Sequence, residues 1–158
     1  MEKQIQIQFR LLDVKQLQFV SLTNQWPDGE LQITNQLQFN ADIDKRILHC
    51  VAHYEYKQNS ITQLLLSVQS SFEFTRDSWS AMYRLQGDEW VLPVGLVQHL
   101  ADVTIGATRG ILAIRSEENG LPRVILPMMA AAQFVKTDLH LKRNPQHTIP
   151  MPSAGGKA

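Results

Sequence analysis

The spacing of hydrophobic residues in this chain changes near residue 94. Before that point apolar and polar residues alternate, as in LQITNQLQF at 31–39. This period of two is typical of strands that bury one face. After it, apolar residues recur every three or four positions, which is the period of an amphipathic helix. The sequence therefore predicts an α+β fold in which an antiparallel sheet is followed by a long helix.

Four strands are predicted in the first half of the chain. They cover residues 4–22, 31–40, 46–57 and 61–74, with turn sequences at 40–45 and 58–60. One face of this sheet is apolar. The other face is rich in glutamine where many sheets carry charge; its residues are Gln4, Gln6, Gln8, Gln32, Thr34, Gln36 and Gln38.

The helix predicted from residue 94 is about 23 residues long by its apolar period. Its predicted buried stripe is Val97, Leu100, Thr104, Ala107, Ile111 and Ile114. Gly106 and Gly110 lie four residues apart on one side of it, flanking Arg109. Each glycine inside a helix costs roughly 1 kcal/mol relative to alanine. We therefore expect another backbone to approach closely at Gly106 and Gly110.

The predicted sheet is too wide for one helix to cover. Four strands at a spacing of about 4.8 Å span roughly 19 Å, whereas one helix covers about 10 Å. The second predicted helix, over residues 128–139, is short. A second copy of the chain is the simplest cover for the remaining apolar face, and the two glycines would then mark the subunit interface.

Composition limits the functions available to this chain. It has 158 residues, 44% of them hydrophobic, which is enough for one domain with a core. Fifteen basic and 15 acidic side chains give a formal net charge of zero, which argues against a nucleic-acid partner. No signal-peptide pattern and no apolar run of about 18 residues is present, so we expect a cytoplasmic protein that does not insert into membranes. No cofactor motif is recognisable.

The order of these elements resembles the SecB protein-export chaperones and their SecB-like relatives. The residues that carry the resemblance are NQWPDGELQI at 24–33, TRGILAIRSE at 108–117 and VILPMMAAAQFV at 124–135. The resemblance runs from about residue 4 to residue 139. It implies a homotetramer, built as a dimer of dimers with long helices between two sheets, that binds non-native polypeptides without ATP and is not an enzyme.

The resemblance also divides the chain and implies a client-binding groove. Residues 1–139 form the SecB-like domain, and residues 140–158, which are rich in proline and small residues, are predicted to be disordered. The groove would lie between the loop at 24–33, the final helix and the segment before that helix. The candidate client-binding residues are Trp26, Leu126, Met128, Met129 and Phe134.

The partners implied by the resemblance are unfolded polypeptides or preproteins. SecB offers an acidic sheet face to the motor protein SecA, and the amide-rich face of this chain weakens the expectation of SecA docking without removing it. A general role in export and a dedicated role with an antitoxin both remain open.

Two other functions and several ordinary structural roles compete with this interpretation. A hot-dog thioesterase also combines a sheet with one long helix, and His99 and Asp102 are the helix residues that would serve it. A non-catalytic assembly or adaptor subunit is the other alternative. The methionines and Phe134 also suit ordinary core packing, as do Trp79 and Trp90. His49 and His53, four residues apart on one strand, are expected to be hydrogen-bonded histidines and not metal ligands.

Overall fold

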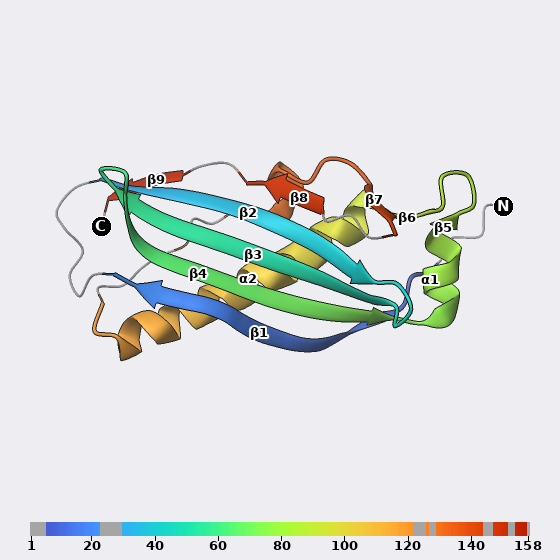
Figure 1. Cartoon of the computed structure of the whole chain (residues 1–158), viewed down its shortest axis with the longest axis horizontal. Helices are drawn as coiled ribbons and strands as arrows, with labels where there is room; N and C mark the ends of the chain where they lie inside the picture. Colours follow the sequence, from blue (N-terminus) through green and yellow to red (C-terminus); the bar gives the residue numbers. More distant parts are fainter. Residues whose placement is uncertain are drawn as a thin grey trace.

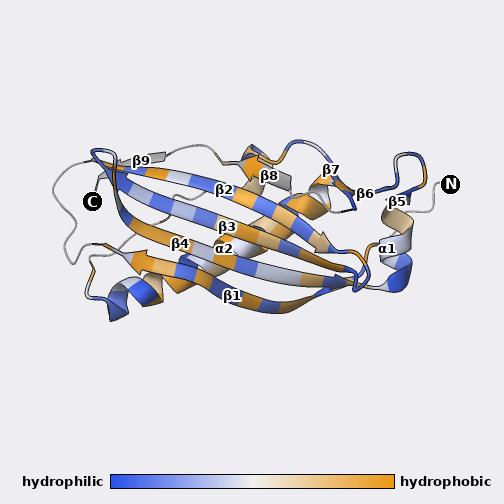
Figure 2. Ribbon diagram, viewed as in Figure 1, coloured by the Kyte–Doolittle hydropathy of each residue, from blue (hydrophilic) through white to orange (hydrophobic). Residues whose placement is uncertain are grey.

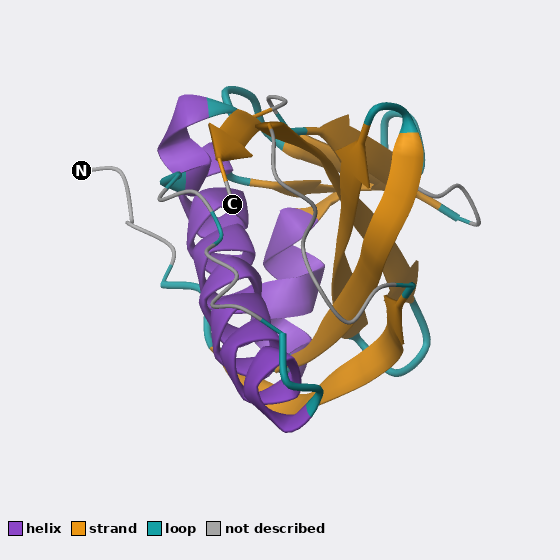
Figure 3. Ribbon diagram, turned by 90° about the vertical axis from the view of Figure 1, so that its left-hand side faces the viewer, coloured by secondary structure: helices purple, strands orange, loops and turns teal. Residues whose placement is uncertain are grey.

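The computed structural model describes residues 6–22, 30–121, 126, 129–143, 147–151 and 154–157. A long sheet forms one layer, and one long helix crosses a single face of that sheet diagonally (Figure 1). Seen along the sheet, the helix stands beside the strands and leaves the opposite face without a helical cover (Figure 3). The α+β fold with a four-stranded antiparallel sheet is thus confirmed.

The four long strands are β1 (Phe9–Ser21), β2 (Glu30–Asp42), β3 (Ile47–Gln58) and β4 (Ile61–Phe74). They are antiparallel in the order β1-β4-β3-β2, so the first strand lies beside the fourth. The predicted turn between β3 and β4 is a two-residue hairpin. Asn59 and Ser60 both have positive φ, at 50° and 64°, as a type I′ turn requires.

Alternation along the strands separates an apolar inner face from a polar outer face. In β2, Leu37 and Phe39 are fully buried, whereas Gln32, Thr34 and Gln36 are exposed. The colouring by hydropathy shows the same alternation across the sheet (Figure 2). The period of two was therefore a correct guide to which face packs against the helix.

The long helix is α2 (Val94–Glu118), which begins after Pro93 and ends before Gly120, a residue with a φ of 65°. Its buried residues are Val97, Leu100, Ala101, Thr104, Ile105, Thr108, Leu112 and Ser116. The predicted stripe is therefore only partly buried, and Ile114 is 58% exposed. Thr108 joins the buried stripe because its hydroxyl bonds within the helix and donates to the Thr104 carbonyl at 2.7 Å. The hydroxyl of Thr104, which was in the predicted stripe, donates to the Leu100 carbonyl at 2.9 Å in the same way.

A smaller three-stranded sheet closes one end of the molecule. It consists of β5 (Tyr83–Arg84), β6 (Glu89–Leu92) and β7 (Leu139–Lys142), and it follows helix α1 (Arg76–Met82). Trp79 and Trp90 stack at 5.6 Å between ring centroids, and each is 5% exposed. Their predicted place in the core is confirmed.

The short helix predicted over residues 128–139 is reduced to one 3-10 turn, η1 (Ala131–Gln133). Side chains of α2 bind the backbone groups of this segment. Asp102 accepts from the Ala131 amide at 2.8 Å, and Gln98 donates to the Val135 carbonyl at 2.9 Å. These bonds hold the segment extended along α2, where a longer helix would need the same groups for itself.

The end of the chain adds two short strands to the large sheet. They are β8 (His147–Pro150) and β9 (Ala154–Lys157), and both pair antiparallel with β2. The sequence predicts disorder over 140–158, whereas the described residues of that range are mostly in strands. Composition favoured disorder because it ignores the free backbone groups that the edge of β2 offers to an extended segment.

Candidate functional site

Strand β1 exposes large apolar side chains although it belongs to the main sheet. Among the described strands it pairs with β4 alone, and register shifts leave Leu12 and Leu17 as extra residues in the ladder. We call its four exposed apolar residues the β1 surface; they are Leu11, Leu12, Val14 and Leu17, with exposures of 48%, 39%, 39% and 50%. Exposed apolar side chains beside an open strand edge are typical of a contact with another polypeptide.

Helix α2 runs beside β1 in the same direction. Near its start the His99 ring lies 6.0 Å from the Phe9 ring, and near its end Arg115 donates to the Gln16 side chain at 2.7 Å. Gly106 and Gly110 are exposed, and a Cβ added at either would meet no atom within 4 Å apart from the backbone of its own helix. The described residues of the chain therefore do not make the close approach expected at these glycines.

The uncovered part of the inner face is smaller than the sequence suggested. On the β2 side, residues after α2 complete the core, including Leu126, Val135 and Met151, each at most 5% exposed. Among the described residues, large exposed apolar groups gather on β1, and α2 itself exposes Ile114. The sequence predicts that half of the inner face stays uncovered. In the structure the exposed apolar area is smaller and is concentrated on the β1 surface.

The predicted client-binding residues do not form one surface. Trp26 and Met128 lie outside the described residues. Leu126 is 3% exposed and belongs to the core, so it offers no surface to a partner. Met129 and Phe134 are half-buried, with Phe134 packed against the core.

Phe134 borders a hollow of about 260 Å³ on the β2 side. The chain between η1 and β7 forms most of its wall, and β8 contributes one residue. The lining residues are Phe134, Val135, Lys136, Thr137, Asp138, Leu139, His140 and Ile149. We call it the Phe134 hollow. Its buried floor is apolar, whereas Lys136, Asp138 and His140 are exposed and carry both signs of charge.

Leu139 and Ile149 were missed as site residues because they lie at the edge of, or within, the segment predicted to be disordered. A signal was present for Leu139: it alternates with Leu141 in LHLK, as a half-buried strand requires. Ile149 stands between threonine and proline and shows no such pattern.

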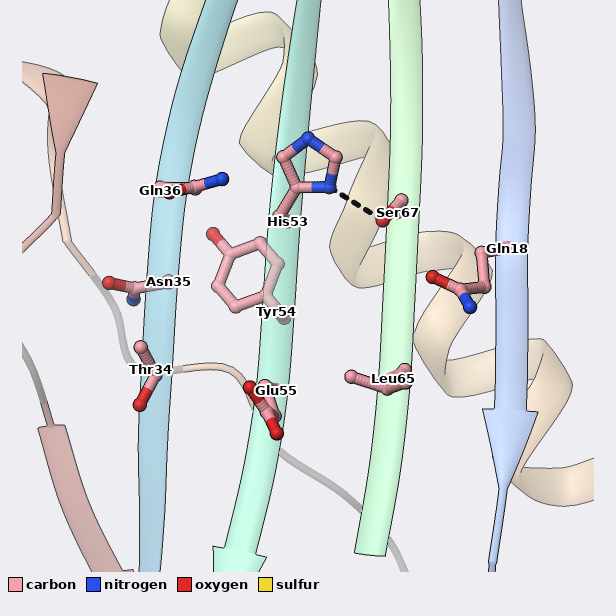
Figure 4. A pocket seen from close by; sticks show the side chains of 9 residues that line it. All are labelled: Gln18, Thr34, Asn35, Gln36, His53, Tyr54, Glu55, Leu65 and Ser67. Atoms are coloured by element: carbon pink, nitrogen blue, oxygen red, sulfur yellow. Dashed lines mark hydrogen bonds between the residues drawn. The ribbon is translucent and has the colours of Figure 1, made fainter. Parts of the chain in front are cut away.

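A second hollow, of about 250 Å³, lies on the sheet face turned away from α2 (Figure 4). It is lined by all four long strands through Gln18, Thr34, Asn35, Gln36, His53, Tyr54, Glu55, Leu65 and Ser67. Its one carboxylate, Glu55, accepts from the Thr62 hydroxyl and lies 3.7 Å from the Lys57 ammonium group. Most residues around this hollow have polar side chains, and the Lys57 ammonium group lies close to the one carboxylate.

A serine–histidine pair at this hollow has the hydrogen bonds of a structural pair. The His53 Nδ1 lies 2.7 Å from the Ser67 hydroxyl and its Nε2 lies 3.2 Å from the amide oxygen of Gln38. Because that oxygen can only accept, Nε2 carries the proton and Ser67 donates to Nδ1. Ser67 is 7% exposed. An accessible nucleophile and a carboxylate on the histidine, both found in hydrolase triads, are missing from this pair.

His99 and Asp102, the two helix residues considered for a thioesterase, make contacts elsewhere in the fold. His99 packs on Phe9, and the carboxylate of Asp102 accepts from the Ala131 amide. No cluster of three or more histidine, cysteine, aspartate or glutamate side chains that suits a metal occurs among the described residues. His49, like His53, bonds a serine: its Nδ1 lies 2.8 Å from the Ser71 hydroxyl.

The buried thiol of Cys50 has no chemical role in this arrangement. It is fully buried beneath α2, and burial raises its pKa to about 12. A thiol with this pKa is not a nucleophile near neutral pH.

No helix in the described part of the chain is long and apolar enough to cross a membrane.

The two serine-bonded histidines predict a pH dependence of stability. Burial lowers the pKa of both His49 and His53 below 6.5. The unfolded chain therefore binds more protons than the folded chain at mildly acidic pH, and the free energy of unfolding should fall as the pH drops below about 6.5. We expect the melting temperature to fall between about pH 7.5 and pH 5.5.

The matched variants for this measurement replace histidines by glutamine, whose amide keeps hydrogen-bonding capacity without titrating. His49→Gln combined with His53→Gln should flatten the dependence of the melting temperature on pH. His140→Gln, at an exposed position on β7, leaves both serine-bonded rings intact and is the control. An unchanged pH profile in the double variant would contradict the assignment.

The comparisons with known proteins give a distant structural likeness. No family model matches the chain, and no curated protein matches it in sequence. Among solved structures, the chain is similar to the SecB-like chaperone Rv1957 of Mycobacterium tuberculosis, solved in complex with a ChAD peptide from the Rv1956 HigA1 antitoxin. The match covers 77% of this chain and 90% of that chain, with a TM-score of 0.49 and 11% identity.

Proposed function

We propose that this chain is an ATP-independent chaperone that binds non-native polypeptides, in protein export or as a dedicated SecB-like chaperone. The observation that carries the proposal is the Phe134 hollow, where the half-buried side chains of Phe134 and Ile149 offer apolar surface beside a rim of mixed charge. An unfolded chain exposes scattered apolar side chains, and such a surface binds them through the hydrophobic effect without a chemical step.

The rim of the Phe134 hollow supports binding of many sequences. Lys136 and Asp138 are both exposed on it, so neither sign of charge dominates. A hollow of this kind selects for exposed apolar groups and against little else. Trp26 and Met128, from the resemblance to SecB, remain proposed members of the client-binding surface, as do Met129 and Phe134.

We further propose that the protein assembles as a homotetramer, a dimer of dimers, through the β1 surface and the glycines of α2. An antiparallel pair of β1 strands centred on Val14 would place Asp13 of one copy opposite Lys15 of the other, twice by symmetry. The open space in front of Gly106 and Gly110 then accommodates a helix from another copy.

The test of the chaperone proposal is suppression of aggregation of a chemically unfolded client, followed by light scattering without nucleotide. Phe134→Asp should weaken capture by up to roughly 2 kcal/mol, the contribution of one aromatic anchor among several weak contacts. Leu85→Asp is the matched control, because Leu85 is 84% exposed in the turn between β5 and β6, away from the hollow.

Phe134 packs against the core, so thermal unfolding of Phe134→Asp must be measured alongside its capture of client. Trp26→Ala extends the same assay to the segment before β2. Equal suppression of aggregation by wild type, Phe134→Asp and Leu85→Asp would remove the Phe134 hollow from the function. No suppression by the wild-type chain would overturn the chaperone proposal.

A further inference from the structure

The edge of β2 is occupied by the end of the same chain. Residues 147–150 pair with Gln36–Phe39, and residues 154–157 pair with Glu30–Ile33. The occupant therefore adds a strand to the edge of the long four-stranded sheet, in two pieces of four residues each. Strand addition of this kind is the way in which extended peptides dock on open sheet edges.

Two apolar side chains anchor this added strand on the inner side of the sheet. Met151 is 5% exposed; its sulfur lies 4.0 Å from the hydroxyl of Tyr54, and its amide donates to the Asn35 carbonyl. Ile149 lies opposite Leu37, is half-buried, and lines the Phe134 hollow. The anchors are two residues apart, so both point to one face of an extended strand.

The sequence of the rest of the added strand contains few large apolar residues. Strand β9 reads Ala-Gly-Gly-Lys, with almost no side-chain surface to bury. In β8, Pro150 has no amide hydrogen to donate to the ladder. Short segments with few buried apolar groups open at low free-energy cost compared with the core of a domain. Because β8 and β9 are only four residues long each, we expect the occupant of the β2 edge to open more readily than the long central strands β3 and β4.

We infer that the edge of β2 is a strand-accepting site for an extended segment of another polypeptide that carries two apolar side chains two residues apart. Residues 147–157 are the chain's own occupant of that site and compete with such a segment. The inference rests on the proposed function and deepens it: the Phe134 hollow holds a side chain of the client, while the neighbouring edge of β2 pairs with its backbone. Backbone pairing suits clients of varied sequence, because every extended segment offers the same amides and carbonyls.

Tethering sets the scale of this competition. A segment attached to the same chain acts at an effective concentration on the order of millimolar. Consider an outside segment whose intrinsic dissociation constant is micromolar. Its apparent affinity equals its intrinsic affinity multiplied by the fraction of time that the edge is vacant. Loosening the chain's own strand should therefore tighten binding of the outside segment without any change at the edge itself.

The experiment uses the full-length chain and a fluorescein-labelled peptide of residues 146–158 as the probe. Ile149→Asp combined with Met151→Asp removes both anchors and should tighten peptide binding at least tenfold in fluorescence anisotropy. Gly155→Pro disturbs the pairing of β9 with β2 without altering a buried anchor, and should tighten binding about threefold, since only half of the strand is released. Leu85→Asp is the control and should bind the peptide as the wild type does.

Hydrogen exchange supplies a second readout at the edge. Amides of residues 36–39 should exchange faster in the double variant than in wild type, and the peptide should restore their protection. Equal peptide affinity in wild type, the double variant and Gly155→Pro overturns the inference, as does the absence of renewed protection at residues 36–39 on adding the peptide.

The outcome separates this inference from the proposed function. A chain that suppresses client aggregation but shows no change in peptide binding among these variants keeps the chaperone function and loses the strand-accepting edge. A chain whose variants bind the peptide as expected, but whose wild type and double variant both fail to suppress aggregation, keeps the edge and loses the chaperone function.

Discussion

Reversing the charge of Asp13 is expected to shift the protein to smaller species. In the proposed antiparallel contact, Asp13→Lys places a lysine opposite Lys15 of the other copy at two symmetric positions. Each like-charge pair costs on the order of 1 kcal/mol, and the lost attraction adds to this, so the dissociation constant should rise roughly 10- to 100-fold. Sedimentation velocity across a micromolar concentration series measures the change.

The matched control for this substitution is charge exchange. Asp13→Lys combined with Lys15→Asp restores opposite charges across the contact and should restore assembly. A wild-type chain that sediments as a monomer at micromolar concentration would contradict the proposed assembly. Equal assembly of the single variant and the double variant would show that β1 is not the contact.

Gly110→Leu is expected to act in opposite directions on the protomer and on its assembly. Within the protomer a Cβ at Gly110 meets nothing within 4 Å, and leucine favours a helix over glycine by about 0.5–1 kcal/mol. At a close helix contact the same side chain should cost about 1–3 kcal/mol through overpacking. We therefore expect a chain that unfolds at a higher temperature when dilute but assembles less tightly.

Gly95 offers the matched control for this experiment, because it is exposed in the first turn of the same helix and has equally open surroundings. Gly95→Leu should leave assembly unchanged. Thermal unfolding at low concentration and sedimentation at high concentration measure the two effects separately. Normal assembly of Gly110→Leu would show that the glycines of α2 do not lie at a close contact between copies.

The serine–histidine pair on the outer sheet face has the hydrogen bonds of a structural pair. The Ser67 hydroxyl bonds His53, whose other nitrogen meets the amide of Gln38, and burial lowers the pKa of that histidine. A neutral histidine held in this way orders the polar face of the sheet. It has neither the exposed nucleophile nor the charged partner from which acyl transfer starts.

Alternation and helical spacing were sufficient to predict the main elements. Three elements lie close to their predicted bounds: the strands over 31–40 and 61–74 and the helix from 94. Each of them buries one face, so its apolar residues recur with the period of a strand or a helix. The satisfied state of His49 and His53 was also predictable, since partly buried polar rings in a sheet pair with neighbouring hydroxyl groups.

Composition and local spacing did not determine the parts that depend on a distant partner. The segment after α2 has a helical pattern, but Gln98 and Asp102 bind its backbone and keep it extended apart from η1. Leu126 was predicted as a client-binding residue through the resemblance to SecB and is part of the core in the fold. Neither outcome follows from a sequence window, because the competing hydrogen bonds and contacts come from residues about 20 to 40 positions away.

The sequence by itself determined the layers of this protein: which residues alternate, which face of the sheet is polar, and that one helix crosses the other face. Tertiary structure alone decided the two edges of the sheet. Strand β1 keeps an open edge with exposed leucines, while the edge of β2 takes up residues that composition assigned to a disordered tail. The physical reason is that an edge is defined by backbone groups left without a neighbour, and backbone groups are the same in every sequence.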